Sequence, residues 1–394
     1  MAKEIEMYNT YFGDCFIVKN EDSNLLVDFG VRRNSKIWHT TYTGRRTLLS
    51  DIAEDIANRY KKQTISLLIT HFHDDHVSGL VKMQTSGLPQ YKNLFKKIYI
   101  PDIWDNPFIF ITNSLEKIVL ESQLRKTKLP YTTSSLFDLI AFICINCRST
   151  YLLSRGVEFE NGKYRALWPP KGIEINDFEE YFNSLPLPND LKRDLLRIAT
   201  QICTYVQSSI YGDFFDYSVI SIEKTIKRYE RQYKKAIKDY KNQIEDLVDF
   251  QTLNELNHKI NIVFHDSINN TENMLFTGDA EDYDMNTIAT ATDYPLHEKY
   301  KYIKIPHHGT TRHYFNFSRY VPEHVLIPNG EVNFKDPATH EAYKIDERYG
   351  LLTSRHTCSN CNNCKACDKA CHYPITCIGS TKNVVFPLLY TTIR

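Results

Sequence analysis

Residues 65–76, ISLLITHFHDDH, contain the feature that most constrains how this chain can fold. The run 65–70 is short and almost wholly apolar, which predicts a buried strand. Because alternate side chains of a strand project to the same side, His71 and His73 are expected to point together, with Asp75 and His76 beside them as the chain turns. Burying several imidazoles and carboxylates together without a cation costs free energy. The segment therefore favours a metal site over a polar surface loop.

Two later segments have the same form. The apolar run that begins at 274 ends in Asp279, and the run that begins at 303 ends in His307 and His308. Three expected strand ends therefore carry histidine or aspartate. An α/β scaffold can bring such strand ends together and assemble a two-metal site from them.

These motifs resemble those of the metallo-β-lactamase superfamily, and most closely its ComEC/Rec2-like hydrolase branch. The resemblance rests on HxHxDH at 71–76, TGDAE at 277–281 and PHHGT at 306–310, with further traces in GDC at 13–15, VDFG at 27–30, LWPP at 167–170 and NG at 329–330. It covers residues 1–105, 160–172 and 257–390. It implies an αββα sandwich, into which this chain inserts a helical subdomain and a C-terminal Cys-rich segment.

The resemblance also implies two metal ions and their ligands. His71 and His73 would bind the first metal, Asp75 and His76 the second, and Asp279 would bridge both. One of His307 and His308 would complete the ligand set of the second metal, and the pattern of the branch favours His307. Family members carry a further histidine on the first metal, for which the candidates are Asn257 and His258, although the usual Gly-His-Thr context is missing.

The implied activity is hydrolysis of a phosphodiester, most simply DNA or RNA, by a water that two zinc or manganese ions activate. Asp75 is expected to orient that water, and His308 or Thr310 to hydrogen-bond a substrate oxygen. The alternative is a small-molecule hydrolase that acts on a lactone, a thioester or a cyclic nucleotide, with the helical insertion as a lid. A non-enzymatic scaffold is a third interpretation, which the intact set of candidate ligands disfavours.

A basic segment gives limited independent support for a nucleic-acid substrate. Residues 223–241 contain eight basic side chains against three acidic ones: Lys224, Lys227, Arg228, Arg231, Lys234, Lys235, Lys238 and Lys241. Such a helix face can follow a phosphate backbone, but a solvated helix face explains the same pattern.

Six of the ten cysteines lie close together near the C-terminus: Cys358, Cys361, Cys364, Cys367, Cys371 and Cys377. Thiolates at this density predict a bound metal. The spacing over 361–371 is that of bacterial ferredoxins, but His372 replaces the usual proline and no second motif is present. A structural zinc ion, with His356 or His372 as substitute ligands, is therefore favoured over an iron–sulfur cluster. The other four, Cys15, Cys144, Cys147 and Cys203, are expected to be buried thiols.

The expected organisation is two halves of one fold separated by helices. Residues 1–105 form the first half, 106–256 mostly helical insertions with a fold segment near 160–172, and 257–394 the second half, including the Cys-rich insert 356–378. Strands are expected at 14–18, 24–28, 65–70, 97–100, 260–265, 273–277, 302–306, 325–328 and 383–388, and helices over most of 105–160 and 175–256.

A seven-residue apolar repeat runs through the second helical stretch, at Ile226, Tyr233, Tyr240 and Leu247. It predicts a long amphipathic helix or the arm of a helical hairpin, which can close within one chain or form a homodimer through 222–250.

The bulk composition excludes a few classes. Lys+Arg and Asp+Glu both number 48, so no global field steers the chain toward nucleic acid or a membrane. The N-terminus lacks the apolar stretch of a signal peptide, and no run approaches the roughly 18 apolar residues of a membrane span. These features predict a cytoplasmic protein.

Overall fold

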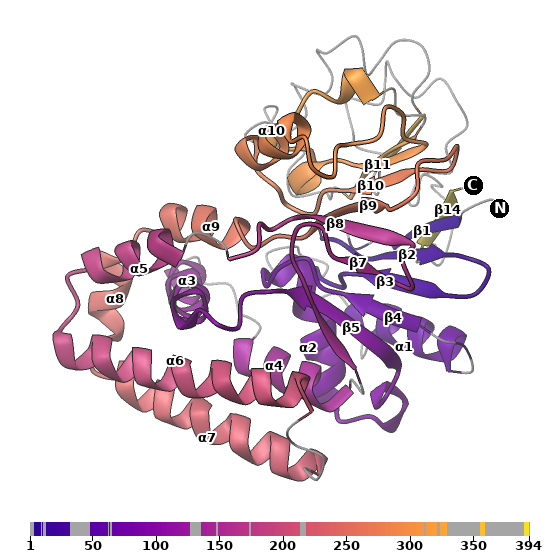
Figure 1. Cartoon of the computed structure of the whole chain (residues 1–394). Helices are drawn as coiled ribbons and strands as arrows, with labels where there is room; N and C mark the ends of the chain where they lie inside the picture. The colour runs from indigo at the N-terminus through magenta and orange to yellow at the C-terminus, as the bar shows by residue number, and fades with distance from the viewer. Residues whose placement is uncertain are drawn as a thin grey trace.

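The computed structural model describes residues 4–8, 10, 13–31, 48–61, 63, 65–126, 135–146, 149–172, 175–212, 218–310, 313–320, 324–328, 355–358 and 390–393. Within them the fold is mixed α/β, with ten α-helices and two seven-stranded sheets (Figure 1). The predicted α/β class is confirmed at this level. No helix in these ranges is long and apolar enough to cross a membrane.

The first sheet combines an antiparallel and a parallel half. Its order is β14 (Tyr390–Ile393), β1 (Glu4–Tyr8), β2 (Phe16–Lys19), β3 (Asn24–Val27), β4 (Ile65–Leu68), β5 (Phe95–Pro101) and β6 (Thr150–Leu153). The strands from β14 to β3 pair antiparallel, and those from β3 to β6 pair parallel.

The second sheet has a similar plan. Its order is β13 (Arg355–Cys358), β12 (His324–Ile327), β11 (Tyr302–Lys304), β10 (Met274–Phe276), β9 (Val263–Asp266), β8 (Tyr164–Trp168) and β7 (Glu158–Phe159). Strands β10 to β13 pair parallel, while β7 to β10 pair antiparallel.

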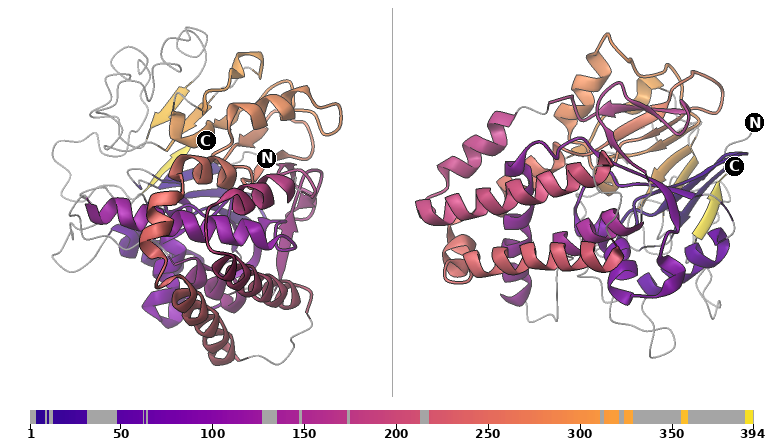
Figure 2. Two further views of the ribbon diagram at one scale, coloured as in Figure 1. Left: turned by 90° about the vertical axis from the view of Figure 1, so that its left-hand side faces the viewer. Right: turned by 60° about the horizontal axis from the view of Figure 1, so that its bottom comes forward.

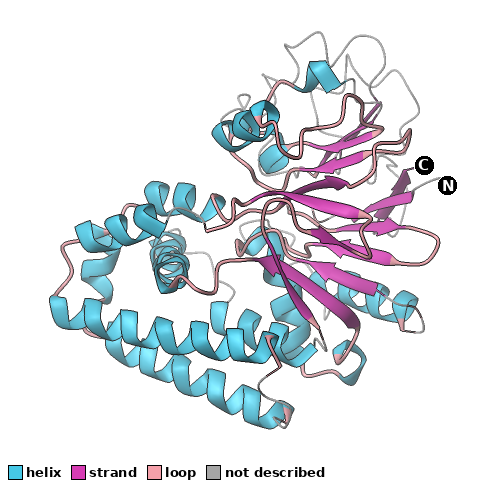
Figure 3. Ribbon diagram, viewed as in Figure 1, coloured by secondary structure: helices cyan, strands magenta, loops and turns pink. Residues whose placement is uncertain are grey.

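The two sheets pack face to face, with helices on their outer faces (Figure 3). In β2, Phe16 and Val18 belong to the apolar cluster between the sheets, whereas Ile17 belongs to the cluster under the helices, as the period of two requires. Phe16 meets Phe276 of the second sheet with ring centroids 5.3 Å apart. Helices α1 (Leu48–Tyr60) and α2 (Asp74–Ser86) pack in the cluster of the first sheet, and α10 (Asp282–Thr290) packs on the second.

The remaining helices form a lobe at one side of the sheets, on the left in Figure 1 and in two further views in Figure 2. They are α3 (Pro107–Lys126), α4 (Leu136–Asn146), α5 (Ile175–Ser184), α6 (Asn189–Ile210), α7 (Val219–Ile237), α8 (Lys241–Leu247) and α9 (Phe250–His258). Helix α7 packs on α4 and α6, and α3 packs on α6 and α9. The buried side chains of the lobe are continuous with the core of the first sheet.

Several elements differ from the sequence predictions. Strand β1 was not predicted, and residues 150–159 form the strands β6 and β7 with a turn between them instead of helix. The long helix breaks between α7 and α8, and Leu247 is 42% exposed, although Ile226 and Tyr233 are buried as the repeat predicts. The apolar face of α7 is covered within the same chain, so the structure gives no support to the predicted homodimer.

Other predictions lie outside the described residues. These are the strand at 383–388, the turn at 329–330, Cys147 and the Cys-rich insert beyond Cys358, which ends β13.

Close packing at Gly30 holds the start of α2 against the loops that contain Asp14 and Phe29. The amide of Asp14 donates to the carbonyl of Asp75 at 2.9 Å, and the amide of Phe29 donates to the carbonyl of His76 at 2.8 Å. A Cβ at Gly30 would collide with the backbone of Asp75 and His76. The close approach of these segments therefore requires glycine at this position.

We expect Gly30→Ala to lower the free energy of unfolding by about 2–3 kcal/mol, because the added methyl group meets backbone that cannot move aside without shifting α2. Gly172→Ala is the matched control: its Cβ meets no atom within 4 Å, and only its φ of +64° opposes the change, at about 1 kcal/mol. Urea unfolding of both variants measures the difference. Equal losses would contradict the packing described here.

Candidate metal centre

The site forms where parallel strands of both sheets end. Asp28 follows β3, residues 71–76 follow β4, Asp279 follows β10, and His307 and His308 follow β11. Asp14 precedes β2, which is antiparallel to β3, so the start of β2 lies beside the end of β3. The last contributor is His258, the final residue of α9. Elements distant in sequence thus converge at one edge of the sandwich.

Three histidines form a first donor group. His71, His73 and His258 each place a ring nitrogen within 4.8 Å of the others, in a geometry that can hold a metal ion. Of the two candidates for the further ligand of the first metal, Asn257 and His258, the structure brings His258 to this group. Asn257 instead donates its side-chain amide to the Glu116 carboxylate.

A second donor group surrounds Asp279. Its Oδ2 lies 3.2 Å from Nε2 of His76 and 3.7 Å from Nε2 of His308. Nε2 of His308 also lies 3.5 Å from Oδ2 of Asp75. On the other side, Nε2 of His71 is 3.9 Å from the same Asp279 oxygen. Asp279 therefore lies between the two groups, as a ligand common to both would.

The structure distinguishes the adjacent histidines. His308 is fully buried and lies with Asp75 and His76, whereas the His307 side chain is 22% exposed and groups with His258 and Asp279. The geometry thus favours His308 in the second group, where the sequence pattern favours His307. Their backbone φ angles are +56° and +43°. This left-handed conformation costs about 1–2 kcal/mol at a non-glycine residue, and it allows two successive imidazoles to face one site.

Each imidazole of the two groups except His71 has a carboxylate behind it. The pairs are His76 Nδ1 with Asp28 at 2.8 Å, His308 Nδ1 with Asp14 at 3.1 Å, His73 Nε2 with Glu116 at 3.2 Å, and His258 Nδ1 with Glu281 at 3.4 Å. His71 Nδ1 instead meets the Thr70 hydroxyl at 3.1 Å. Such partners fix which ring nitrogen faces a metal and raise the basicity of the ligand.

The sequence analysis missed several of these residues. Asp14 and Asp28 were noted only as motif traces, and Glu116 gave no signal because it lies on α3 in the helical lobe. A lysine at the end of the short apolar strand β11 indicates a buried negative charge nearby, and this indication is present in the sequence itself. Lys304 is fully buried, and its Nζ lies 2.7 Å from Asp14 and 3.4 Å from Asp279.

The protonation states follow from burial and neighbouring charge. Burial lowers the pKa of His71 well below its usual value, and His76 and His73 add to the effect. Burial also lowers the pKa of His258. Burial opposes the ionised form of Asp279, but His76, His308 and His307 outweigh it and hold the pKa of Asp279 well below the usual range. Burial opposes the charged forms of His76 and His308, but Asp279 and Asp14 outweigh it, so the pKa of His76 lies well above its usual value and that of His308 is raised to about 9. Divalent cations bind neutral imidazoles and ionised carboxylates, so a metal in the second group would displace these two protons.

Unsatisfied buried atoms provide a test of whether a metal fits. Among the described residues, Nε2 of His71, Nε2 of His258 and Oδ2 of Asp279 have no hydrogen-bond partner. Leaving such an atom unpaired costs about 1–3 kcal/mol. A cation between the groups would satisfy all three, so the donor set fits a bound metal.

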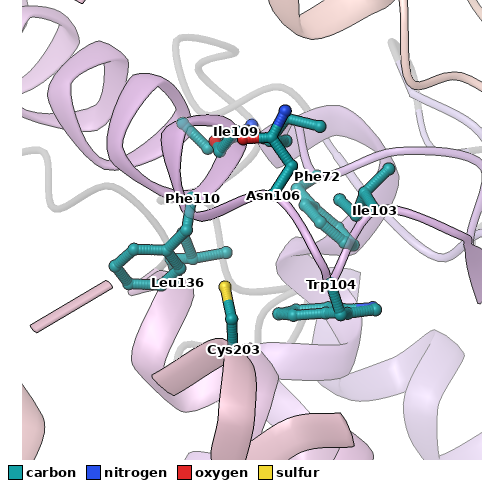
Figure 4. A pocket seen from close by; sticks show the side chains of 9 residues that line it. Phe72, Ile103, Trp104, Asn106, Ile109, Phe110, Leu136 and Cys203 are labelled. Atoms are coloured by element: carbon teal, nitrogen blue, oxygen red, sulfur yellow. Dashed lines mark hydrogen bonds between the residues drawn. The ribbon is translucent and has the colours of Figure 1, made fainter. Parts of the chain in front are cut away.

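A nearby cavity is not a substrate site. It holds only about 10 Å³ and is lined mainly by apolar side chains, among them Phe72, Trp104 and Leu136 (Figure 4). Cys203 also lines it, and burial raises the pKa of this thiol to about 12, so it is an inert core cysteine. Cys15 is likewise buried, and Cys144 is partly buried.

Comparison with known proteins adds no assignment. No family model matches the chain, and no curated protein matches it.

We expect His308→Ala to weaken Mn²⁺ binding by at least about 100-fold, because loss of a partner behind a ligand alone costs about 10–100-fold. His307→Ala is the matched control and should weaken binding less. Mn²⁺ is the suitable probe because thiolates at the Cys-rich insert bind it poorly. Equilibrium dialysis with elemental analysis gives both affinities; a larger loss in the His307 variant would return the ligand role to His307.

We expect Glu116→Gln to weaken Mn²⁺ binding by about 10-fold or more, because the neutral amide no longer supports His73 as an anionic partner. Glu121→Gln, on the same helix but paired with Lys241 at 3.5 Å, is the control and should bind like the wild type. An unchanged affinity in the Glu116 variant would show that α3 contributes only packing to the site.

Proposed function

We propose that this chain is a metal-dependent hydrolase with two divalent cations, and that its substrate is a phosphodiester of DNA or RNA. One observation carries the proposal: two groups of buried donors flank the same carboxylate oxygen of Asp279. Paired groups that share a carboxylate are the arrangement of two-metal hydrolytic sites.

The layer order supports a specific fold assignment. Helices cover both outer faces of two packed sheets, and the donor residues follow strands of each sheet. Together with the motifs at 71–76, 277–281 and 306–310, this layering supports a metallo-β-lactamase fold of the ComEC/Rec2-like branch, with the α3–α9 lobe as an insertion.

Two cations bound here would lower the pKa of a water toward neutrality and neutralise charge on the phosphoryl oxygens. The chain supplies the remaining functions. Burial opposes ionisation of Asp75, yet His308 and His76 keep its pKa below the usual value, so this carboxylate stays ionised and can orient the attacking water by accepting a hydrogen bond from it. His71, His73, His76, His258, Asp279 and His308 would hold the cations, zinc or manganese.

The role we propose for His307 is a contact with the substrate. Its ring is held by Thr310, whose Oγ1 lies 2.6 Å from His307 Nδ1 and 2.9 Å from His313 Nδ1. His307 is the more exposed of the adjacent pair, and its Nε2 lies 3.5 Å from Oδ2 of Asp279, so it can hydrogen-bond a substrate oxygen that is bound beside this carboxylate. This is the role that the sequence analysis gave to its neighbour His308.

We expect Asp279→Ala to reduce phosphodiester hydrolysis at least about 100-fold, because it removes the oxygen that both donor groups share. The assay uses single- and double-stranded DNA and RNA, bis-p-nitrophenyl phosphate, a β-lactam and a lactone, each with Mn²⁺ or Zn²⁺. Asp282→Ala, an exposed carboxylate at the start of α10, is the control and should retain full activity.

Turnover of the lactone or β-lactam without turnover of any phosphodiester would replace the proposed substrate by a small molecule. Phosphodiester hydrolysis that survives in the Asp279 variant would exclude this site as its source.

A further inference from the structure

The exposed face of α7 carries an unbroken row of cations. Its basic stripe consists of five side chains spaced three or four residues apart, the last of them at the residue that caps the helix: Lys224, Arg228, Arg231, Lys235 and Lys238. With about 100° between successive helical residues, they fall within an arc of about 80°. All five are exposed, while the opposite face, with Ile226, Tyr229, Tyr233 and Ile237, is buried. The stripe is therefore one continuous surface rather than charges scattered around a helix.

This charge is not neutralised within the part of the chain that the structure describes. None of the five cations has a carboxylate within 4 Å there, whereas the nearby Lys234 pairs with Glu230 at 2.6 Å. On helix α6, by contrast, the Arg193 side chain is paired with the Asp190 carboxylate at 2.7 Å. Because the whole chain has a net charge of zero, the stripe is a local excess of positive charge that an external anion can neutralise.

The first half of the stripe borders a surface hollow of about 360 Å³. Its lining combines cations with hydroxyl groups: Ser218, Ile220, Ser221, Lys224, Thr225, Arg228 and Arg231. Ammonium, guanidinium and hydroxyl groups are the donors that contact phosphate oxygens in nucleic-acid complexes. The exposed Ile220 adds an apolar surface for a sugar or base.

Helix α2, which begins at the metal centre, contacts α7 at the start of the stripe. The side-chain amide of Gln84 on α2 donates to Glu223 of α7 at 3.3 Å, next to the first cation of the stripe. Asp75 and His76 lie in the first turn of the same α2. The axial rise from His76 to Gln84 is about 12 Å, so α2 joins the metal centre to the N-terminal part of α7.

We propose that the basic stripe of α7 binds the phosphate backbone of a polynucleotide whose scissile bond lies in the metal centre, an inference that rests on the proposed phosphodiesterase function. From Lys224 to Lys238 the stripe extends about 21 Å, which is the length of about six phosphates on one strand of a duplex. The stripe contacts phosphates only, so it binds without sequence preference.

The test reverses four charges of the stripe in the variant Lys224→Glu, Arg228→Glu, Arg231→Glu and Lys235→Glu. The matched control reverses four exposed lysines elsewhere: Lys61, Lys92, Lys171 and Lys299, each to Glu. Both sets cause the same change of net charge. Fluorescence anisotropy with labelled 20-mers of single- and double-stranded DNA and RNA measures binding in an Asp279→Ala background, and circular dichroism confirms that each variant is folded.

We expect the stripe variant to bind about 100-fold more weakly at 0.1 M salt, with a salt dependence of log K reduced by about 3, because each lost phosphate contact removes about 0.7–0.9 from the slope. With Asp279 restored, cleavage of polynucleotide should fall through a higher KM, while hydrolysis of bis-p-nitrophenyl phosphate stays within about twofold of the wild type. The four-lysine control should behave like the wild type in each assay.

The outcomes separate the two proposals. Polynucleotide cleavage by the wild type with unchanged binding by the stripe variant would overturn the inference and leave the function standing. An equal loss in the four-lysine control would also overturn it, since net charge alone would then explain binding. Absence of phosphodiester hydrolysis by the wild type, tested on bis-p-nitrophenyl phosphate as well, would instead overturn the function.

Discussion

The charge balance at the buried edge of the two sheets governs the rest of this site. Asp14, Asp28 and Asp279 are buried there with Lys304 as the one lysine or arginine among the described residues that contacts them. Burying an ionised carboxylate costs several kcal/mol unless an opposite charge compensates it. Burial keeps His71 and His258 neutral, whereas the surrounding carboxylates outweigh burial at His76 and His308 and raise the pKa values of both. Protons on His76 and His308 balance part of the carboxylate charge, and a divalent cation could replace them at the open nitrogen and oxygen atoms between the two groups.

The two-sheet scaffold supplies the precision that such a site requires. Short strands with both faces buried end at one edge, so each donor leaves a rigid element rather than a long loop. Backbone hydrogen bonds then join the loops: the amide of Asp279 donates to the Asn261 side chain at 3.0 Å, and the amide of Ile262 donates to the carbonyl of Thr70 across the sheets at 3.0 Å. These contacts fix Asp279 relative to His71 before any metal binds.

The sequence predicts features that depend on neighbouring residues better than features that depend on contacts between distant parts of the chain. The 65–76 segment was predictable because a strand and its donors are contiguous, and the seven-residue repeat located the buried face of α7 through Ile226 and Tyr233. Glu116 was not, because its role depends on α3 packing against α9, a long-range contact without a local pattern. The choice of His308 over His307 depends on left-handed backbone angles that the sequence PHHGT does not specify. Strand β1 was missed although residues 4–7 alternate polar and apolar side chains, which is a local strand pattern; it pairs with β2 and β14.

The helical lobe is more closely tied to the site than a lid would be. Glu116 of α3 lies behind His73, and the Lys117 ammonium next to it bonds the carbonyl of Phe72 and the carboxylate of Asp74, both at 2.9 Å. His258, at the end of α9, is itself a donor. A lid that opens and closes would break these buried contacts in every cycle, at a cost of about 1–3 kcal/mol for each polar group exposed unpaired. The lobe is therefore better explained as a fixed wall that completes the first donor group than as a lid.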